Sequence, residues 1–194
     1  MTGLIILAAG ESSRFGQPKQ NLLFRNKTLL QHAIETGLHS GCKPVIVVLG
    51  ANSNLIDTQI ADENFRVIYN EDWQEGIASS IRMGVKEIEK DNSINEALIM
   101  LCDQPFVDTG LINNILQKKT DAQAAIVACS YNNTIGVPAL FDRSLFAELL
   151  LLTGNDGAQK IIKNHPRETA TIPFDLGGVD IDTNADYQQL IKDS

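Results

Sequence analysis

A run of small, hydroxylated and cationic residues follows the first apolar segment of the chain. From residue 8 it reads A-A-G-E-S-S-R-F-G-Q-P-K. Small residues let the backbone approach a ligand closely, and successive N–H groups can form a nest for an anion. Serine hydroxyls add donors, an arginine offers a fork that matches phosphate oxygens, and a lysine adds a mobile charge. The residues predicted to contact phosphate are Ala8, Ala9, Gly10, Ser12, Ser13, Arg14 and Lys19.

This loop differs from two common phosphate-binding motifs. It has neither the G-x-G-x-x-G of dinucleotide-binding proteins nor the G-K-[ST] of P-loop enzymes. Residues 12–34 contain no Asp or Glu but include Arg14, Lys19, Arg25 and Lys27, in a chain of net charge −8. A positive island on an acidic protein suits a small anionic ligand. Chance clustering of charge on a solvated loop is the alternative for the cations taken alone.

Acidic residues follow two other segments that read as strands. Asp103 comes directly after the apolar run that starts at residue 97, and Asp182 follows a short alternating run near the carboxyl terminus. Carboxylate oxygens are ligands that Mg²⁺ prefers. Each aspartate also has a structural alternative, since Asp103 could cap the turn before Pro105, and Asp182 or Thr183 could cap the last helix.

A polar segment, residues 70–76, lies between an apolar run and a helical pattern that begins at Ile77. Ser79 and Ser80 fall in the first turn of this predicted helix, where backbone N–H groups favour an anion or a carbonyl oxygen. Gly76 and Ser80 are therefore candidate ligand contacts. The alternative is that the two serines only cap the helix, and for Trp73 we expect packing on the outside of that helix.

The elements that would position these residues alternate along the chain. Residues 4–9, 45–49, 65–69, 97–102 and 124–129 are short apolar runs, typical of strands buried on both faces of a parallel sheet. Apolar stripes at helical spacing begin at Leu29, Ile77 and Leu111. Shorter strands are expected at 136–141, 169–174 and 179–181, and helices at 144–152, 156–164 and 184–193. This alternation predicts a three-layer α/β/α sandwich with a mostly parallel sheet, folded as one domain over residues 1–194.

Composition excludes several classes of protein. With 43% hydrophobic and 21% charged residues, the chain reads as globular, and its apolar runs fall far short of the roughly 18 residues of a membrane span. No basic leader precedes the first apolar run, so a secretory signal is not expected. The three cysteines lack C-x-x-C spacing, which favours reduced thiols in a cytoplasmic protein. The acidic balance argues against binding of duplex nucleic acid.

Several blocks together resemble one family. The loop matches the signature L-A-A-G-x-S-x-R-[FM]-G-x-x-K of nucleotidyltransferases with the GT-A-like, Rossmann-related fold of nucleotide-diphospho-sugar transferases. The blocks NEDWQEGIASSIRMGV, MLCDQPFVD, GVPALFD, TGNDGAQKII and DIDTNADY follow in the family's order. Within this MobA-like group the chain is most similar to the molybdenum cofactor cytidylyltransferases, since guanylyltransferases typically read L-A-G-G where this chain has Ala9.

The resemblance implies an activity and a set of roles. It implies Mg²⁺-dependent transfer of CMP from CTP to the phosphate of molybdopterin carrying molybdenum, with release of pyrophosphate. Asp103 and Asp182 would bind the metal, Arg14, Lys19 and Asp103 would be catalytic, and Gly76 and Ser80 would contact the base. The amino-terminal half would bind nucleotide and the carboxyl-terminal half the acceptor. A molybdoenzyme or its chaperone would receive the product, with no nucleic acid or membrane involved.

Two departures from the family pattern lie in the predicted acceptor half. Residues 132–135 read N-N-T-I where many relatives have Gly and a basic residue, and Gln159 stands where Arg is common. The open alternatives are a nucleotidyltransferase acting on a sugar or alditol phosphate, a GTP-using molybdopterin guanylyltransferase, and a non-catalytic module that binds a nucleotide or cofactor.

Overall fold

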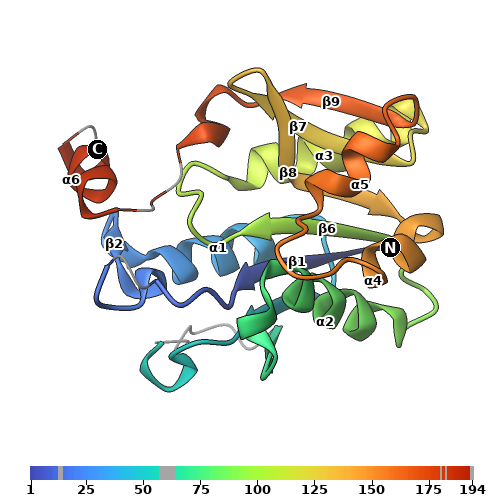
Figure 1. Ribbon diagram of the computed structural model, residues 1–194. Helices are drawn as coiled ribbons and strands as arrows, with labels where there is room; N and C mark the ends of the chain where they lie inside the picture. The colour runs from blue at the N-terminus through green and yellow to red at the C-terminus, as the bar shows by residue number, and fades with distance from the viewer. Residues whose placement is uncertain (13–14, 57–63, 180, 182, 193–194) are drawn as a thin grey trace.

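The computed structural model describes residues 1–12, 15–56, 64–179, 181 and 183–192. Its centre is a seven-stranded sheet in the order β5-β4-β1-β6-β8-β7-β9 (Figure 1). The strands are β1 (Thr2–Ala8), β4 (Val45–Leu49), β5 (Phe65–Tyr69), β6 (Glu96–Leu101), β7 (Ile126–Tyr131), β8 (Thr134–Asp142) and β9 (Thr169–Pro173). All neighbouring pairs are parallel except the two that involve β8. The predicted mostly parallel sheet is confirmed.

Helices cover both faces of this sheet, because successive side chains of a strand point to opposite sides. In β1, Ile5 and Leu7 pack with helices α2 (Ile77–Glu89), α4 (Phe146–Leu150) and α5 (Gln159–Asn164). Leu4 and Ile6 pack with α1 (Leu29–Leu38) and α3 (Thr109–Ala122) on the other side. The result is the predicted three-layer sandwich, whose strands come from both halves of the chain.

A smaller apolar cluster lies beside the main sheet. The hairpin β2 (Leu23–Phe24) and β3 (Lys27–Thr28) packs there against the last helix, α6 (Asn184–Lys192). Phe24, Ile181 and Leu190 are buried in this cluster, and the Tyr187 hydroxyl donates to the Leu23 carbonyl at 2.9 Å. The carboxyl-terminal segment is thereby brought next to the segment that follows β1 (Figure 1).

Three predictions about the second half were wrong in detail. The described residues Val179 and Ile181 lie in no strand, because a 3-10 turn, η5 (Asp175–Gly178), ends just before them and Ile181 is buried in the α6 cluster instead. The helix expected at 144–152 divides into a 3-10 turn, η4 (Arg143–Leu145), and α4. The helix expected from residue 156 begins at Gln159 with Ala158 as its N-cap, because a turn closed by the Asp156 N–H and the Thr153 carbonyl comes first.

Three further 3-10 turns connect the described elements, η1 (Lys19–Asn21), η2 (Ser53–Leu55) and η3 (Trp73–Glu75). None of the helices in the described ranges is long and apolar enough to cross a membrane. The predicted division into a nucleotide half and an acceptor half stays a prediction.

Candidate functional site

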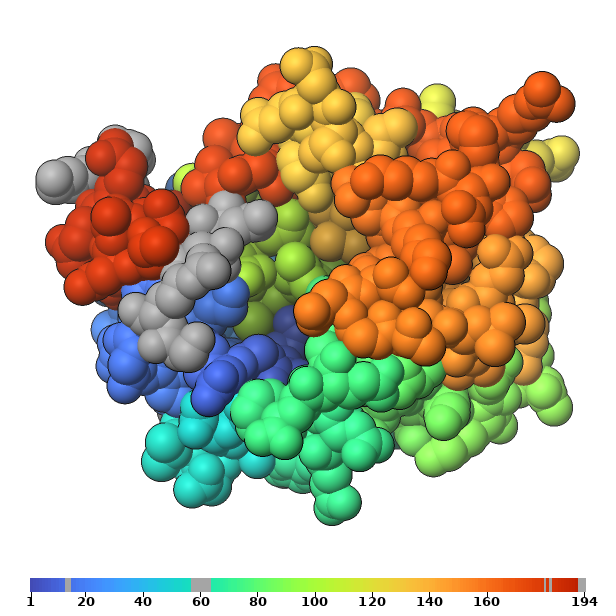
Figure 2. All heavy atoms as spheres, viewed as in Figure 1, coloured from blue at the N-terminus to red at the C-terminus, as the bar shows by residue number. Residues whose placement is uncertain are grey.

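A cavity of about 350 Å³ opens where β1 and β6 end. In an open α/β sheet, ligands bind beyond the carboxyl ends of the strands, so this is the expected edge. Figure 2 shows the surface hollowed here, between the blue amino-terminal segment, the green segment near residue 75 and the orange segment near residue 155. The cavity is lined by Leu7, Ala8, Ala9, Gly10, Glu11, Lys19, Gln20, Trp73, Gln74, Gly76, Ile77, Ser80, Leu101, Cys102 and Asp103.

The structure brings most of the predicted contacts together in this cavity. Ala8, Ala9, Gly10, Lys19, Gly76, Ser80 and Asp103 all line it. Ser12 lies just behind it, since its hydroxyl accepts from the Lys19 N–H at 3.1 Å. Ser13, Arg14 and Asp182 fall outside the described residues, so their predicted roles stay predictions.

The loop after β1 leaves room for a ligand at its glycine. A Cβ added at Gly10 would meet no atom within 4 Å, whereas Ala8 and Ala9 are buried. The protein's own packing therefore does not require glycine at this position. The open space is consistent with close approach of the backbone to a ligand.

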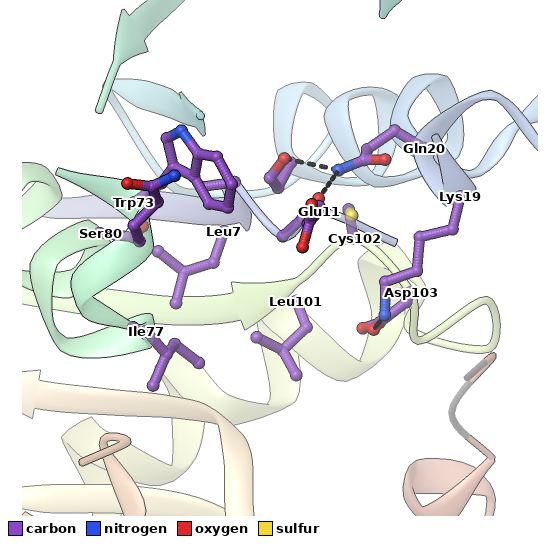
Figure 3. Close-up of a pocket in the computed structure, with 15 residues that line it drawn as sticks. Leu7, Glu11, Lys19, Gln20, Trp73, Ile77, Ser80, Leu101, Cys102 and Asp103 are labelled. Carbon is purple, nitrogen blue, oxygen red and sulfur yellow. Dashed lines mark hydrogen bonds and ion pairs between the residues drawn. The ribbon is translucent and has the colours of Figure 1, made fainter. Parts of the chain in front are cut away.

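Gln20, which the sequence analysis did not single out, fixes the course of this loop. Its side-chain Nε2 donates to the carbonyls of Ala8 at 2.7 Å and Gly10 at 3.2 Å, as Figure 3 shows. Its Oε1 accepts from the Ser12 hydroxyl at 3.5 Å, and only 1% of the residue is exposed. The sequence offers only a weak signal for this role, a polar residue directly after Lys19.

Lys19 and Asp103 form an ion pair across the cavity (Figure 3). The lysine ammonium contacts Oδ2 of the aspartate, and both side chains are largely buried, at 17% and 12% exposure. The other carboxylate oxygen, Oδ1, is buried and has no hydrogen-bond partner among the described residues. An unpaired buried carboxylate oxygen is costly. A cation bound there would satisfy it, so Asp103 fits the predicted role of metal ligand.

Within the residues that the structure describes, no group of three or more His, Cys, Asp or Glu side chains is placed to hold an ion. Thr183 does cap α6 as the alternative reading proposed, because its hydroxyl accepts from the Asp186 N–H at 3.2 Å. A cap at Thr183 leaves Asp182 available as a ligand, and the ligand role of Asp182 stays a prediction.

The start of α2 forms the opposite wall of the cavity. Gly76, its N-cap, has φ of +120°, and a Cβ there would lie 2.4 Å from the Gly154 carbonyl oxygen. Only glycine fits such a backbone conformation and such a close approach. The same Gly154 oxygen accepts from the Ala78 N–H at 3.1 Å, so the helix start is joined to the segment before α5.

Asn70 sets the orientation of both serine hydroxyls. Its buried Nδ2 donates to the Ser79 oxygen at 2.8 Å and to the Ser80 oxygen at 2.9 Å. The Ser79 hydroxyl in turn donates a hydrogen bond to the Gly76 carbonyl at 2.8 Å. Because Ser80 accepts from Asn70 and lines the cavity, its hydroxyl can donate to an acceptor atom of a ligand.

Trp73 lines the cavity (Figure 3), whereas the sequence predicted only packing on the outside of the helix. Gly50 makes the position possible. A Cβ on Gly50 would lie 2.7 Å from Trp73 Cβ and 2.9 Å from Ala9 Cβ. Glycine at position 50 therefore allows Trp73 and Ala9 to lie this close to the backbone. A flat aromatic side chain in a cavity wall can stack on a nucleotide base.

An arginine joins this wall to the carboxyl-terminal half. The Arg82 guanidinium donates to Glu75 Oε1 at 2.7 Å and Oε2 at 2.5 Å, and to the Leu152 carbonyl at 2.8 Å. Glu75 Oε1 also accepts from the Gly154 N–H at 3.2 Å. The hydrogen bonds from Arg82 are the main reason that the pKa of Glu75 falls to about 2. We call Glu75, Arg82, Leu152 and Gly154 the clamp.

The cysteines are not part of the chemistry. Cys42, Cys102 and Cys129 are buried and unpaired, as expected of core residues. Cys102 lines the cavity beside Asp103, but burial raises the pKa of its thiol to about 12. A thiol that stays protonated is a poor nucleophile.

Comparison with known proteins identifies the family. Residues 4–169 match the model of the MobA-like NTP transferase domain. The chain is 30% identical to nicotine blue oxidoreductase of Paenarthrobacter nicotinovorans, over 96% of this chain and 95% of that one. It is 33% identical to the molybdenum cofactor cytidylyltransferase of Escherichia coli K12, over 45% of this chain and 46% of that one.

Solved structures agree with this family. The crystal structure of Rv0371c from Mycobacterium tuberculosis H37Rv superposes with a TM-score of 0.85 at 28% identity, over 98% of this chain and 97% of that one. A second structure of the same protein, in complex with manganese, superposes with a TM-score of 0.82 at 26% identity, over 100% and 99%. The chain therefore belongs to the MobA-like NTP transferase family and is a nucleotidyltransferase.

Proposed function

We propose that this nucleotidyltransferase transfers CMP from CTP to the phosphate of molybdopterin carrying molybdenum and releases pyrophosphate. The observation that carries the proposal is the pairing of Lys19 with Asp103 in the cavity that residues 8–10, which we call the Gly10 loop, also line. A cation, a carboxylate with one unpaired oxygen and a loop of small residues thus border one cavity. Such a set suits a triphosphate and its divalent cation.

The reaction needs alignment and charge stabilisation more than a nucleophilic side chain. An oxygen of the acceptor phosphate forms a bond to the α-phosphorus of CTP, and the bond between that phosphorus and the bridging oxygen to the β-phosphorus breaks. The electron pair leaves with pyrophosphate. Because a phosphate monoester is already ionised at neutral pH, the acceptor oxygen requires no general base, and the protein's contribution is positioning.

Each described residue then has a defined task. Backbone N–H groups of the Gly10 loop and the Lys19 ammonium would stabilise charge on the departing pyrophosphate. A lysine on a flexible stem can keep contact with Asp103 and still reach a phosphate oxygen. Ser80 would donate to a carbonyl oxygen of the base, and Trp73 would stack on the ring. The predicted Arg14 would add a second cation to the loop.

A divalent metal ion fits one described residue. Asp103 would hold Mg²⁺ through Oδ1, with Asp182 as its predicted second ligand, and the bound ion would supply positive charge to the phosphate oxygens. The manganese complex of Rv0371c shows that a related chain binds a divalent ion. Magnesium is the ion that we propose for this chain.

The choice of CTP and molybdopterin depends on similarity. The sequence has Ala9 in place of the second Gly of the guanylyltransferase loop, and the E. coli relative is a molybdenum cofactor cytidylyltransferase. The cytoplasmic location and a molybdoenzyme or its chaperone as recipient follow from the same likeness and stay predictions.

A second candidate function comes from the relative that matches nearly the whole chain, whose name is that of an oxidoreductase. An enzyme of that kind would need a redox nucleotide in the same cavity. Titrating the protein with CTP, GTP, UTP, ATP, NADH and NADPH, each with and without Mg²⁺, separates the candidates. Ligands that bind the folded state raise its melting temperature. A shift with CTP and Mg²⁺ alone supports our proposal, and a shift confined to a reduced nicotinamide nucleotide would favour the oxidoreductase.

The decisive assay is pyrophosphate release with CTP and the acceptor. Asp103→Asn keeps the shape of the side chain but removes its charge, so we expect turnover to fall by about a hundredfold or more while the protein stays folded. Asp121→Asn is the matched control, because Asp121 lies on the exposed side of α3, accepts from the Gln117 amide and lines neither cavity described in this article. Full activity in Asp103→Asn would remove the metal assignment. Tight CTP binding without turnover would instead indicate a non-catalytic binding module.

A further inference from the structure

We call the cavity at the ends of β1 and β6 the nucleotide cavity. A second, smaller cavity adjoins it and is lined by residues of different chemistry. It measures about 200 Å³, and Leu7, Ile77 and Leu101 line both cavities. Figure 3 shows these three side chains gathered between the two strands and the start of α2. On its far side the second cavity is lined by Tyr131, Val137 and the segment from Gly157 to Gln159. We call it the ring cavity.

Charged side chains do not line the ring cavity in the described part of the chain. Its lining residues include no Asp, Glu, Lys, Arg or His, and most of them are aliphatic. The nucleotide cavity next to it is lined by Lys19, Asp103 and Glu11. An ionised group placed in the ring cavity would lose hydration without gaining a charged partner among the lining residues, which is unfavourable.

The polar side chains of Tyr131 and Gln159, which line the ring cavity, form hydrogen bonds with other residues of the chain. Gln159 Nε2 donates to the Thr134 hydroxyl at 2.8 Å and to the Ile135 carbonyl at 3.0 Å, and its Oε1 accepts from Lys163 at 3.1 Å. The Tyr131 hydroxyl donates to the Val137 carbonyl at 3.1 Å. The side chains that line the cavity therefore offer few hydrogen bonds to the edge of a ligand and much apolar surface to its faces.

Two glycines shape this surface. A Cβ at Gly136 would lie 2.6 Å from the Tyr131 hydroxyl oxygen, so glycine there lets the tyrosine ring lie along the strand. At Gly157 a Cβ would meet no atom within 4 Å, so this residue borders open space. The volume is below the roughly 300–1,000 Å³ of a pocket for a drug-sized ligand, which suits one flat ring system and no more.

We propose that the ring cavity binds the uncharged, flat ring end of the acceptor by its faces, and that it selects rings by shape and lack of charge. This inference rests on the proposed function, since the acceptor's phosphate must reach the nucleotide's α-phosphate near Asp103. With the phosphate there, a ring linked to it by a short chain lies across Leu7 and Leu101. The substrate class thus includes flat, neutral aromatic ring systems and is not restricted to a pterin with its polar edge.

Three small probes test the ring specificity without any nucleotide. The probes are 2-naphthol, which is neutral at neutral pH, 2-naphthoate, which is an anion of the same ring size, and pterin, which is neutral but has a polar edge. Calorimetry or ligand fluorescence gives the dissociation constant of each. We expect 2-naphthoate to bind at least about tenfold more weakly than 2-naphthol, because its carboxylate must be desolvated. Pterin is expected to bind no more tightly than 2-naphthol.

Variants locate the binding in the ring cavity. Gly157→Leu should weaken binding of 2-naphthol by about tenfold or more, because the new side chain projects into the open space. Thr153→Leu is its matched control, since it adds the same side chain at an exposed position of the same segment that lines neither cavity. Gln159→Arg should increase the affinity for 2-naphthoate relative to the parent protein and leave 2-naphthol unchanged. A gain of affinity cannot arise from misfolding.

The outcomes separate this inference from the proposed function. Equal binding of 2-naphthol and 2-naphthoate, tighter binding of pterin than of 2-naphthol, or no effect of Gly157→Leu would overturn the ring specificity. None of these results depends on CTP turnover. Absence of CTP-dependent pyrophosphate release, with the predicted ring binding intact, would refute the proposed transfer reaction and leave the ring specificity supported.

Discussion

Replacing Gln20 by Leu tests whether its buried amide fixes the conformation of the loop that follows β1. The change keeps most of the side-chain volume but removes the Nε2 donor to the carbonyls of Ala8 and Gly10. Gly10 is exposed, so water can replace the lost bond there. Ala8 is 2% exposed, so its carbonyl would be left unsatisfied. An unsatisfied buried acceptor costs about 1–3 kcal/mol, so we expect the free energy of unfolding to fall by about 2 kcal/mol.

Urea unfolding followed by circular dichroism measures this change directly. In a chain of this length, about 2 kcal/mol corresponds to a fall in melting temperature of roughly 4–8 °C. Gln117→Leu is the matched control, because Gln117 lies on the exposed side of α3 and its side chain donates to the exposed Asp121 carboxylate. We expect its stability to change by less than about 0.5 kcal/mol, as is usual for surface substitutions.

The same variant links the stability of the loop to ligand binding. If the Gln20 amide keeps the Ala8 and Gly10 carbonyls turned toward the protein, losing it frees those oxygens to face the triphosphate. A tenfold loss in CTP affinity corresponds to about 1.4 kcal/mol. We expect at least that loss in Gln20→Leu and none in Gln117→Leu. If the two variants unfold at the same urea concentration and bind CTP equally well, the loop does not depend on Gln20.

The remaining predictions concern two glycines and one histidine. Gly76→Ala should destabilise the fold by about 3 kcal/mol or more, because of both the positive φ and the overlap with a backbone oxygen. Gly10→Ala should leave the melting temperature unchanged or higher while weakening CTP binding, and equal destabilisation by the two changes would contradict this reasoning. Hydrogen bonds that His165 donates to Glu148 and to Glu168 raise the pKa of its imidazole above 6.5, so its stabilising effect is full below pH 6.5 and is lost as pH rises through the raised value. The stability difference between the parent and His165→Gln should therefore shrink as pH increases, and an NMR titration midpoint at or below 6.5 would contradict the assignment.

The sheet could be predicted from the sequence because its strands carry their own pattern. The runs at 45–49 and 65–69 match β4 and β5 residue for residue, and the run at 4–9 overlaps β1. A nearly continuous run of aliphatic residues is typical of a strand with helices on both faces of its sheet. This sequence pattern does not depend on which neighbouring strands it pairs with. Asp103 could be placed at the site for a related reason, since the residue after a parallel strand lies at the ligand-binding edge of the sheet.

Side-chain contacts between distant segments could not be predicted in this way. Trp73 enters the cavity wall because Gly50, on the neighbouring strand end, leaves space beside Ala9, and no local pattern relates residues that far apart. Gln20 and Asn70 are buried polar residues whose partners are backbone and hydroxyl groups of other segments. The prediction of a strand at 179–181 was wrong for a similar reason. Ile181 supplies an apolar side chain to the α6 cluster, and periodicity alone does not distinguish that role from a place in the sheet.

The first turns of α2 determine how far nucleotide choice and ring choice can be separated. Gly76 and Ser80 face the nucleotide cavity, Ile81 faces the ring cavity, and Ile77 lines both. The clamp joins this helix start to Leu152 and Gly154. Because Ile77 lines both cavities, a substitution there alters the surroundings of both ligands. Gln20 and Gly157 each line a single cavity, so only changes of that kind can assign an effect on turnover to the nucleotide or to the ring.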